Sequence, residues 1–330
     1  MTFHASQRLD YRDSLRILVT HASKSIHSLR SVALNVPDLA LAEKFYTEIW
    51  HLEVCNRVSG GLYFRGTGGD QHLLSLHEKS GPAEIRNVTL RVRQASALDN
   101  IAAATTLAGG RVVLARGALA EPGGGEAITI ADPAGRIFRL VHGDEQMPAA
   151  SSSTEAARRP DSPSQDRPIR LAHVVLNSAD ILASQKFLET VLDFSLADRT
   201  RIMAFMRCND DHHSIAFGDT DNNALNHIAF VMPDLDSVMR GGGRLKDAGY
   251  PIEWGPGRHG PGNNTFNYFI DPFGVVIEYT ADVQQVDDRY QAGTPEQWAW
   301  GPGRTDHWGI SQAPSAALKS AQRMVQFAKY

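Results

Sequence analysis

The stretch SVALNVPD at residues 31–38 returns as HVVLNSAD at residues 173–180, and this repetition decides the fold. The chain repeats itself twice more: NVTL at 87–90 matches HIAF at 227–230, and DPAG at 132–135 matches DPFG at 271–274. The matching positions lie 139 to 142 residues apart throughout. A nearly constant separation over about a hundred residues indicates an internal duplication rather than chance.

Each half divides again into two units that begin with a strand. LAHVVL at residues 171–176 resembles LNHIAF at 225–230, with a histidine at the same place. Apolar spacing then predicts a helix over about 179–193, and a second helix over about 234–249 that begins at an Asp234 cap. Short alternating strands follow each helix. The unit of strand, helix and strands is thus predicted four times, over about 28–80, 83–143, 170–219 and 222–282.

A polar linker separates the two halves. Ser, Pro and charged residues dominate this stretch, which shows no apolar period. The predicted parts are an N-terminal extension (1–27), an N-terminal half (28–143), the linker (144–169), a C-terminal half (170–290) and a tail (291–330).

Composition places the chain among soluble globular proteins. Its 330 residues are 42% hydrophobic and 21% charged, and the net charge of −4 provides no basic surface for nucleic acid. No apolar run approaches the roughly 20 residues of a membrane helix, and the N-terminus lacks the apolar segment of a signal peptide. We therefore expect a cytoplasmic protein that binds neither nucleic acid nor membrane. Two cysteines, Cys55 and Cys208, are too few for a disulfide framework.

Three residues of the C-terminal half are candidate metal ligands. His173 and His227 occupy equivalent points on the first strands of two paired units, so their imidazoles converge if the units pack about a pseudo-twofold axis. Glu278 follows the apolar run VVI at 275–277 and is expected to end that strand. Two histidines and one carboxylate leave open positions on a metal, which suits Fe(II) with oxygen and an organic ligand. A cation would also neutralise a carboxylate that is otherwise costly to bury.

The N-terminal half provides an internal control for this interpretation. The positions that match the three candidates are Ser31, Asn87 and Arg139, none of which is a good metal ligand. The scaffold therefore does not require ligand-type residues there in order to fold. A single buried histidine is more often a hydrogen-bonded core residue than a ligand, but two at matched repeat positions with a nearby glutamate favour a metal site.

These residues resemble the vicinal oxygen chelate superfamily, and within it the type I extradiol ring-cleavage dioxygenases. The resemblance covers about residues 28–290, and its most specific part is a signature with a fixed order of residues. That signature is matched by Gly257, His259, Tyr268, Asp271, Pro272, Gly274 and Glu278. Asn267 departs from it, because the family prefers an apolar residue just before the tyrosine.

The resemblance implies an α+β fold of four βαβββ modules paired into two domains, with metal ligands His173, His227 and Glu278 in the second. It also implies a catalytic histidine before a small apolar run, where HHSIAF at 212–217 offers two candidates. We choose His213, because alternation along a strand lets only one of the two face the site. His212 is then expected to face outward or to support the loop.

The remaining site residues come from the same resemblance. Tyr268 is expected to donate a hydrogen bond to a substrate oxygen, and His259 to hydrogen-bond near the same oxygen or gate the pocket. Phe205 matches a position that lines the pocket for the aromatic ring, with ordinary core packing as its alternative role. His213 is expected to accept the proton of the substrate and later return it, as suits a residue that titrates near neutrality.

The predicted function is extradiol cleavage of a catechol-type ring by Fe(II) and O2, in the catabolism of aromatic compounds. Mn(II) is an alternative to Fe(II), since both suit such a donor set. Other metal-dependent enzymes of the superfamily, such as a glyoxalase, an epimerase or a hydroquinone dioxygenase, are the first rival, and a metal-free binding protein is the second. We also expect a homo-oligomer. The aromatic tail at 298–309 is expected to lie against the domain surface or a neighbouring subunit, with the pocket mouth as a less favoured place.

Overall fold

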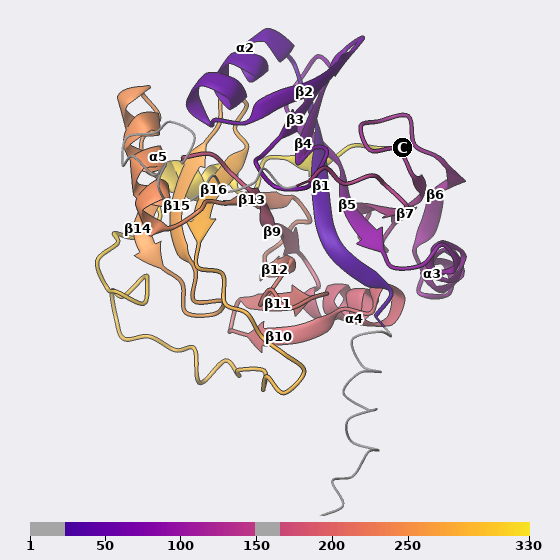
Figure 1. The fold of residues 1–330 in the computed structure, drawn as a ribbon. Coiled ribbons are helices and arrows are strands. Elements are labelled where there is room, and N and C mark those ends of the chain that lie inside the picture. Colours follow the sequence, from indigo (N-terminus) through magenta and orange to yellow (C-terminus); the bar gives the residue numbers. More distant parts are fainter. Residues whose placement is uncertain (1–23, 149–165) are drawn as a thin grey trace, which may run out of the picture.

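A computed structural model describes residues 24–148 and 166–330, and it contains two large mixed sheets (Figure 1). In the first sheet the strand order is β2-β3-β4-β1-β5-β8-β7-β6, and β17(Gln326–Phe327) pairs with β5. Its strands and the helices between them are β1(Ile26–Val36), α2(Leu39–Lys44), the π-helical turn η1(Phe45–Ile49), β2(Glu53–Val58), β3(Gly61–Arg65), β4(Leu74–Glu78), β5(Glu84–Val92), α3(Ser96–Leu107), β6(Arg111–Ala118), β7(Glu126–Ala131) and β8(Ile137–His142).

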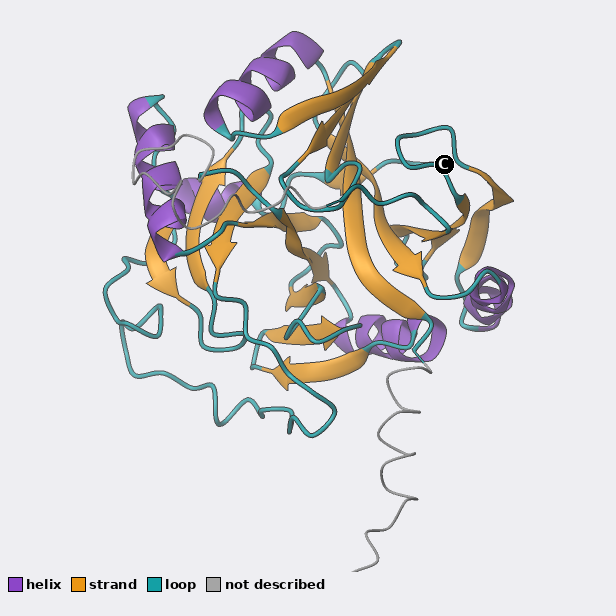
Figure 2. Ribbon diagram, in the orientation of Figure 1, coloured by secondary structure: helices purple, strands orange, loops and turns teal. Residues whose placement is uncertain are grey.

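The second sheet repeats this plan in the order β10-β11-β12-β9-β13-β16-β15-β14. Its elements are β9(Arg170–Ser178), α4(Ile181–Leu192), β10(Ser195–Arg199), β11(Met203–Arg207), β12(Ile215–Asp219), β13(Leu225–Val231), α5(Leu235–Asp247), β14(Trp254–Arg258), β15(Thr265–Ile270) and β16(Val276–Ala281). Most helices lie at the periphery of the sheets (Figure 2). The predicted α+β fold of four strand–helix–three-strand modules is confirmed.

Equivalent residues begin and end the first helix of each half. Asp38 caps α2 by accepting a hydrogen bond from a backbone N–H of the first turn, and Asp180 caps α4 in the same way. His51 and Asp193 then take left-handed backbone conformations, with φ of 64° and 54°, where the chain leaves the helical segment. The duplication therefore preserves local backbone chemistry as well as the order of elements.

Strand register places the two halves in the equivalence that the sequence predicts. In each half, an antiparallel pair of long strands and one parallel neighbour carry the three compared positions. The matching pairs are Ser31–Thr89 with His173–Ala229, Ala33–Asn87 with Val175–His227, and Thr89–Arg139 with Ala229–Glu278. Ser31, Asn87 and Arg139 thus occupy the places of the three candidate ligands.

The N-terminal half fills this equivalent region with an ion-pair cluster. Arg139 lies 2.8 Å from Glu121, and the fully buried Arg30 lies 2.7 Å from the same carboxylate. His72 is buried beside them, with its Nδ1 3.5 Å from Arg30. Fixed guanidinium charges therefore neutralise the partly buried Glu121 carboxylate here. Among the described residues, a His/His/Glu cluster occurs in the C-terminal half alone.

Acid should destabilise the N-terminal half through His72. Burial, followed by the charge of Arg30, lowers the pKa of His72 to about 3. The unfolded chain protonates this histidine near pH 6.5 while the folded chain does not, so stability is lost as the pH falls from 6.5 towards 3. Urea unfolding at pH 7 and pH 5 should differ by about 2 kcal/mol from this group. His72→Gln should remove that increment, and an unchanged pH dependence in the variant would contradict the assignment.

A common core joins the two halves. Trp50 stacks on Tyr279 with ring centroids 3.7 Å apart, and the Tyr279 hydroxyl donates to the Trp50 carbonyl. Tyr46 donates to Asp271 across the same boundary at 2.8 Å. Apolar residues of both sheets form one continuous buried cluster. The second sheet is therefore held against the first by buried aromatic contacts, which fix the frame of the site.

The C-terminal segment crosses from one half to the other. The helix α6(Ala316–Ala321) packs Leu318 against Phe266 and Tyr268 of β15, and β17(Gln326–Phe327) then pairs with β5 of the first sheet. Residues 1–23 of the predicted extension and 149–165 of the predicted linker lie outside the described residues, so the domain boundaries stay predictions. Among the described residues, no helix is both long enough and apolar enough to cross a membrane.

Candidate metal centre

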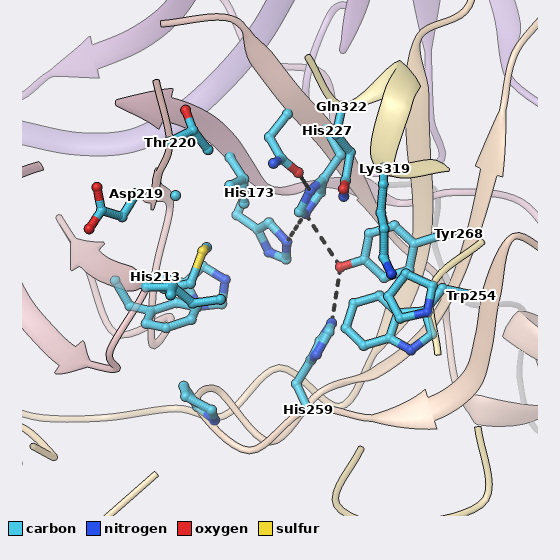
Figure 3. Close-up of a pocket in the computed structure, with 18 residues that line it drawn as sticks. His173, His213, Asp219, Thr220, His227, Trp254, His259, Tyr268, Lys319 and Gln322 are labelled. Carbon is cyan, nitrogen blue, oxygen red and sulfur yellow. Dashed lines mark hydrogen bonds between the residues drawn. The ribbon is translucent and has the colours of Figure 1, made fainter. Parts of the chain in front are cut away.

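Three neighbouring strands bring the candidate ligands together. His173 lies on β9, His227 on β13 and Glu278 on β16, and all three are buried. The Nε2 atoms of the histidines are 3.3 Å apart, and each lies 3.2 Å from Glu278 Oε2. Figure 3 shows the two imidazoles pointing toward one another beside the cavity. The chain therefore has a compact His/His/Glu cluster.

Glu278 lies within its strand, and the expectation that it ends the strand is wrong. β16 continues to Ala281 because β15 pairs with it along its full length, with Tyr268 opposite Glu278. An apolar run does not mark the end of a strand when the next residues are also buried. The central position on a doubly paired strand gives the carboxylate less freedom than a strand end would.

Neighbouring groups keep Glu278 ionised despite its burial. Burial alone would raise its pKa, but the charge of His173 and the hydrogen bond from His173 Nε2 outweigh burial and hold the pKa of Glu278 well below its usual range. Asn264 adds a contact of 3.4 Å from Nδ2 to Oε1. The site therefore presents a carboxylate at neutral pH.

A chain of amides fixes the tautomer of His227. The backbone carbonyl of Gln322 can only accept, so Asn177 donates to it through Nδ2 at 2.9 Å. Asn177 Oδ1 then accepts from Asn226 Nδ2 at 2.9 Å, which turns Asn226 Oδ1 toward His227 Nδ1 at 2.8 Å. His227 therefore carries its proton on Nδ1, and its Nε2 lone pair faces the cluster. Such outer hydrogen bonds orient metal-binding histidines.

This donor set fits a divalent metal ion. Burial lowers the pKa of His227 to about 4, so the imidazole is a neutral donor at pH 7. Ligands on one face of an octahedral ion with bonds of about 2.1 Å lie about 3.0 Å apart, close to the separations of 3.2 and 3.3 Å here. Two nitrogens and a carboxylate with open positions suit Fe(II) or Mn(II).

A cavity of about 380 Å³ opens beside the cluster. The structure places all the remaining predicted site residues on its wall, namely Phe205, His213, His259 and Tyr268. Aliphatic, aromatic and proline side chains supply most of its surface, including Val175, Ile202, Met203, Trp254, Pro261 and Pro314. Apolar pockets of this size with a few convergent polar groups are typical of sites for small organic molecules.

Tyr268 and His259 form one side of the cavity. His259 Nε2 lies 3.0 Å from the Tyr268 hydroxyl, which in turn lies 3.5 Å from His227 Nε2. Burial and the nearby Glu278 charge raise the pKa of Tyr268 well above its usual value, so it remains a hydrogen-bond donor. Asn267, on the opposite face of the same strand, packs against α5, where a Cβ at Gly242 would come within 2.8 Å of its Nδ2. The departure from the family signature thus lies away from the reacting groups.

His213 and Phe205 form the opposite side. The rings of His173 and His213 lie 4.3 Å apart, and Phe205 meets His213 edge-on at 5.0 Å. Burial, then the charges that His173 and His212 can carry, lower the pKa of His213 well below its usual value. His213 is therefore neutral at pH 7 and able to accept a proton.

His212 is buried, and the expectation that it faces outward is wrong. Both histidines precede β12 in irregular backbone, so strand alternation does not separate their side chains. His212 Nδ1 lies 3.0 Å from His213 Nδ1, and His212 Nε2 lies 2.9 Å from Asp198 Oδ2. The second role considered for His212, support of this segment, agrees with these contacts.

Sequence reasoning missed the wall that the C-terminal segment provides. Pro314, Lys319 and Gln322 line the cavity, and Figure 3 shows Lys319 directed toward Tyr268 and Trp254. These three residues follow the aromatic stretch 298–309, which itself lies against the domain surface in agreement with the favoured expectation. There the His307 N–H donates to the Arg258 carbonyl, and the Arg258 guanidinium lies over the Trp308 ring. Residues 314–322 have no counterpart in the other half and no apolar period. No local sequence pattern therefore predicts their contact with β15.

Comparison with known proteins identifies the family. Residues 170–279 match the family model described as Glyoxalase/Bleomycin resistance protein/Dioxygenase superfamily. The chain is 32% identical to a Mn(II)-bound glyoxalase from Novosphingobium aromaticivorans, with a TM-score of 0.79 over 89% of this chain and 94% of that one. The chain belongs to this superfamily.

A second relative and a solved structure with the same fold extend the comparison. Metapyrocatechase 2 from Cupriavidus necator is 27% identical over 311 residues, which cover 84% of this chain and 90% of that protein. Homoprotocatechuate 2,3-dioxygenase from Arthrobacter globiformis has a TM-score of 0.79 at 20% identity and covers 92% of this chain and 94% of that one. The sequence likeness to the first and the shared fold of the second thus extend over both halves of the chain.

Proposed function

We propose that this protein cleaves a catechol-type ring beside its two hydroxyl groups, with a divalent metal and O2. One ring C–C bond breaks and both oxygen atoms of O2 enter the product, so no external reductant is required. The observation that carries the proposal is that His213, Tyr268 and the His/His/Glu cluster line or border one apolar cavity. Sequence similarity to metapyrocatechase 2 over 84% of the chain supports it.

The metal would be held by His173, His227 and Glu278, where it supplies Lewis acidity toward the two oxygens of the diol and a route for electrons between the ring and O2. The protein residues position the substrate and move its protons. Phe205 and Trp254 offer aromatic surfaces to the ring, since both line the cavity. Tyr268, held protonated, donates a hydrogen bond to a substrate oxygen, and His259 holds its hydroxyl at 3.0 Å. His213, neutral and opposite Tyr268, accepts the hydroxyl proton and returns it later.

Either Fe(II) or Mn(II) fits the donor set, and metal supply in the cell selects between them. The glyoxalase relative was solved with Mn(II), which supports Mn(II) as an alternative to Fe(II). We propose Fe(II) as the working metal because one-electron exchange with O2 is chemistry that iron performs readily.

Anaerobic loading tests the function directly. The purified chain is incubated with Fe(II) or Mn(II) without air, and catechols with different substituents are added together with oxygenated buffer. A yellow ring-opened product with one O2 consumed per catechol is the expected result. A chain that binds metal but consumes no O2 with any of the catechols would overturn the proposal.

A glyoxalase-type isomerase is the second candidate, favoured by the name of the relative at 32% identity. Simple isomerisation requires a metal and a base. It does not require a residue that donates a proton to oxygen derived from O2. The set of His213, His259 and Tyr268 favours ring cleavage instead. The same purified protein, assayed with a hemithioacetal of methylglyoxal, should show no isomerisation above the metal-free background.

Lys319 predicts a preference among catechols. It is the one lysine or arginine among the described residues that line the cavity, and no described residue forms an ion pair with it. An acidic substituent on the ring should therefore bind better than a neutral one. Lys319→Met should raise KM for a carboxylated catechol by about 5-fold, equivalent to about 1 kcal/mol, and leave KM for catechol unchanged. The control is Lys246→Met on α5, and equal effects on both substrates would contradict the charge argument.

A further inference from the structure

Three buried side chains form a continuous hydrogen-bonded chain that ends at the cavity. Asp198 on β10 and His212 have no solvent exposure, and His213 is buried as well. Asp198 Oδ2 lies 2.9 Å from His212 Nε2, and His212 Nδ1 lies 3.0 Å from His213 Nδ1. Asp198 and His212 are therefore shielded from solvent, and only His213 reaches the cavity.

The direction of these hydrogen bonds follows from the carboxylate. The Gly293 N–H donates to Asp198 Oδ1 at 2.6 Å, and the Tyr290 hydroxyl donates to the same carboxylate at 3.2 Å. Surrounded by donors, Asp198 acts as an acceptor, so His212 carries a proton on Nε2. In a neutral His212 the Nδ1 atom is then bare. Only one proton can lie between the two Nδ1 atoms, so it belongs to His213 in this state.

This arrangement leaves the other nitrogen of His213 as a bare acceptor. No described residue forms a hydrogen bond with His213 Nε2. The ring is held between His173 and Phe205, and Gly262 lies so close that a Cβ there would come within 3.0 Å of His213 Cε1. His213 also lines the cavity. Its tautomer is thus the one that accepts a proton from a bound substrate.

We propose that His212 and Asp198 are positioning residues that set this tautomer and store the substrate proton. The inference rests on the proposed ring cleavage. The substrate O–H bond breaks and an N–H bond forms at His213 Nε2. The proton on His213 Nδ1 then passes to His212 Nδ1, so that His213 is neutral again. Reversal of the two transfers returns the proton from His213 Nε2 to an oxygen atom of the product.

Charge separation favours this location for the proton. A positive charge on His213 would lie beside His173, within the metal cluster, whereas on His212 it is one imidazole further away and 2.9 Å from the Asp198 carboxylate. The groups that face His212 are Asp198, His213, the Tyr290 ring at 5.7 Å and the Phe205 ring at 5.8 Å. Of these, Asp198 supplies the countercharge.

The N-terminal half offers an internal comparison. His72 precedes β4 as His213 precedes β12, and Tyr63 pairs with Asn56 as Phe205 pairs with Asp198. The residue before His72 is Gln71, and Asn56 takes the place of Asp198. The half with no His/His/Glu cluster among its described residues thus keeps the histidine but has two neutral amides in place of the proton store.

The test uses Asp198→Asn in the full-length protein. Gly293 N–H continues to require an acceptor at Oδ1, so the new amide presents NH2 to His212 Nε2. This inverts the chain: His212 then donates through Nδ1, and His213 holds its proton on Nε2. The matched control is Tyr290→Phe, which removes a hydrogen bond to the same carboxylate and leaves the direction of the chain unchanged.

The first readout is the histidine tautomer, measured by nitrogen-15 NMR on the Zn(II)-loaded resting protein, with the His213 signal identified by its loss in His213→Phe. Wild type and Tyr290→Phe should show a protonated Nδ1 and a bare Nε2, and Asp198→Asn the reverse. A wild-type His213 protonated on Nε2, or an unchanged tautomer in Asp198→Asn, overturns the proposal. Because no catechol is needed, this result is independent of whether the ring is cleaved.

The second readout is turnover with Fe(II). Asp198→Asn should keep its metal and its KM but lose about 100-fold in kcat, the scale of a lost general base. His212→Asn, which can hydrogen-bond but not store a proton, should lose a similar factor and give a second route if Asp198→Asn folds poorly. Tyr290→Phe should remain within about 2-fold of wild type. Wild-type kcat in both relay variants overturns the proposal, whereas an inactive wild type with the expected tautomer refutes ring cleavage instead.

Discussion

Glu278→Gln should leave the protein folded but unable to retain its metal. The amide is similar in size to the carboxylate but removes the negative charge that Glu278 brings to a fully buried cluster. Loss of a ligand should weaken metal affinity by more than the about 10- to 100-fold typical of an outer hydrogen-bond partner. Metal content after dialysis should fall to background, and ring cleavage should be lost with it.

Thermal unfolding supplies an independent measurement of the same effect. Metal at about 100 times its dissociation constant should stabilise the wild type by about 2.7 kcal/mol, and it should not change the stability of Glu278→Gln. Glu48→Gln, an exposed substitution on the turn η1, is the control and should behave as wild type. Full metal occupancy in Glu278→Gln would show that the ligand assignment is wrong.

His213→Phe should have the opposite signature, with metal retained and turnover lost. The aromatic ring preserves packing between His173 and Phe205 but cannot accept or return a proton. General acid–base groups contribute about 100- to 10,000-fold, so kcat should fall within that range. Metal affinity should stay within a few-fold of wild type, because His213 is not one of the three clustered donors.

His72→Gln is the matched control for this variant. It alters the equivalent histidine in the half that has no His/His/Glu cluster, and turnover per folded molecule should be unchanged. Metal loss from His213→Phe would mean that His213 is itself a ligand. Equal losses of turnover in both variants would point to a folding defect common to the two halves.

Much of this architecture is predictable because the chain contains its own comparison. Ser31, Asn87 and Arg139 show which positions the scaffold leaves free, and strand register then places them opposite the same neighbours as His173, His227 and Glu278. Local signals such as the Asp180 and Asp234 caps also fix helix starts. Repeats and caps are properties of short segments, so they can be predicted from the sequence.

Other features depend on contacts between distant segments. His212 is buried because it contacts Asp198 and Tyr290 and lies in irregular backbone before β12. The pattern of residues within HHSIAF does not predict these contacts. The tautomer of His227 depends on a carbonyl at Gln322, nearly a hundred residues later. Such long-range partners are visible only when the chain is folded. They determine the burial of His212 and the tautomer of His227.

The return of the C-terminal segment to the first sheet also has a consequence for modularity. Residues 170–290 expressed alone would lack Lys319 and the Gln322 carbonyl, and a longer piece, 170–330, would lack β5, the strand with which β17 pairs. The C-terminal half therefore depends on the N-terminal half, because β5 holds the end of the segment that lines the cavity. A domain exchange between relatives should accordingly keep the C-terminal segment matched to both the cavity that it lines and the strand β5 that it joins.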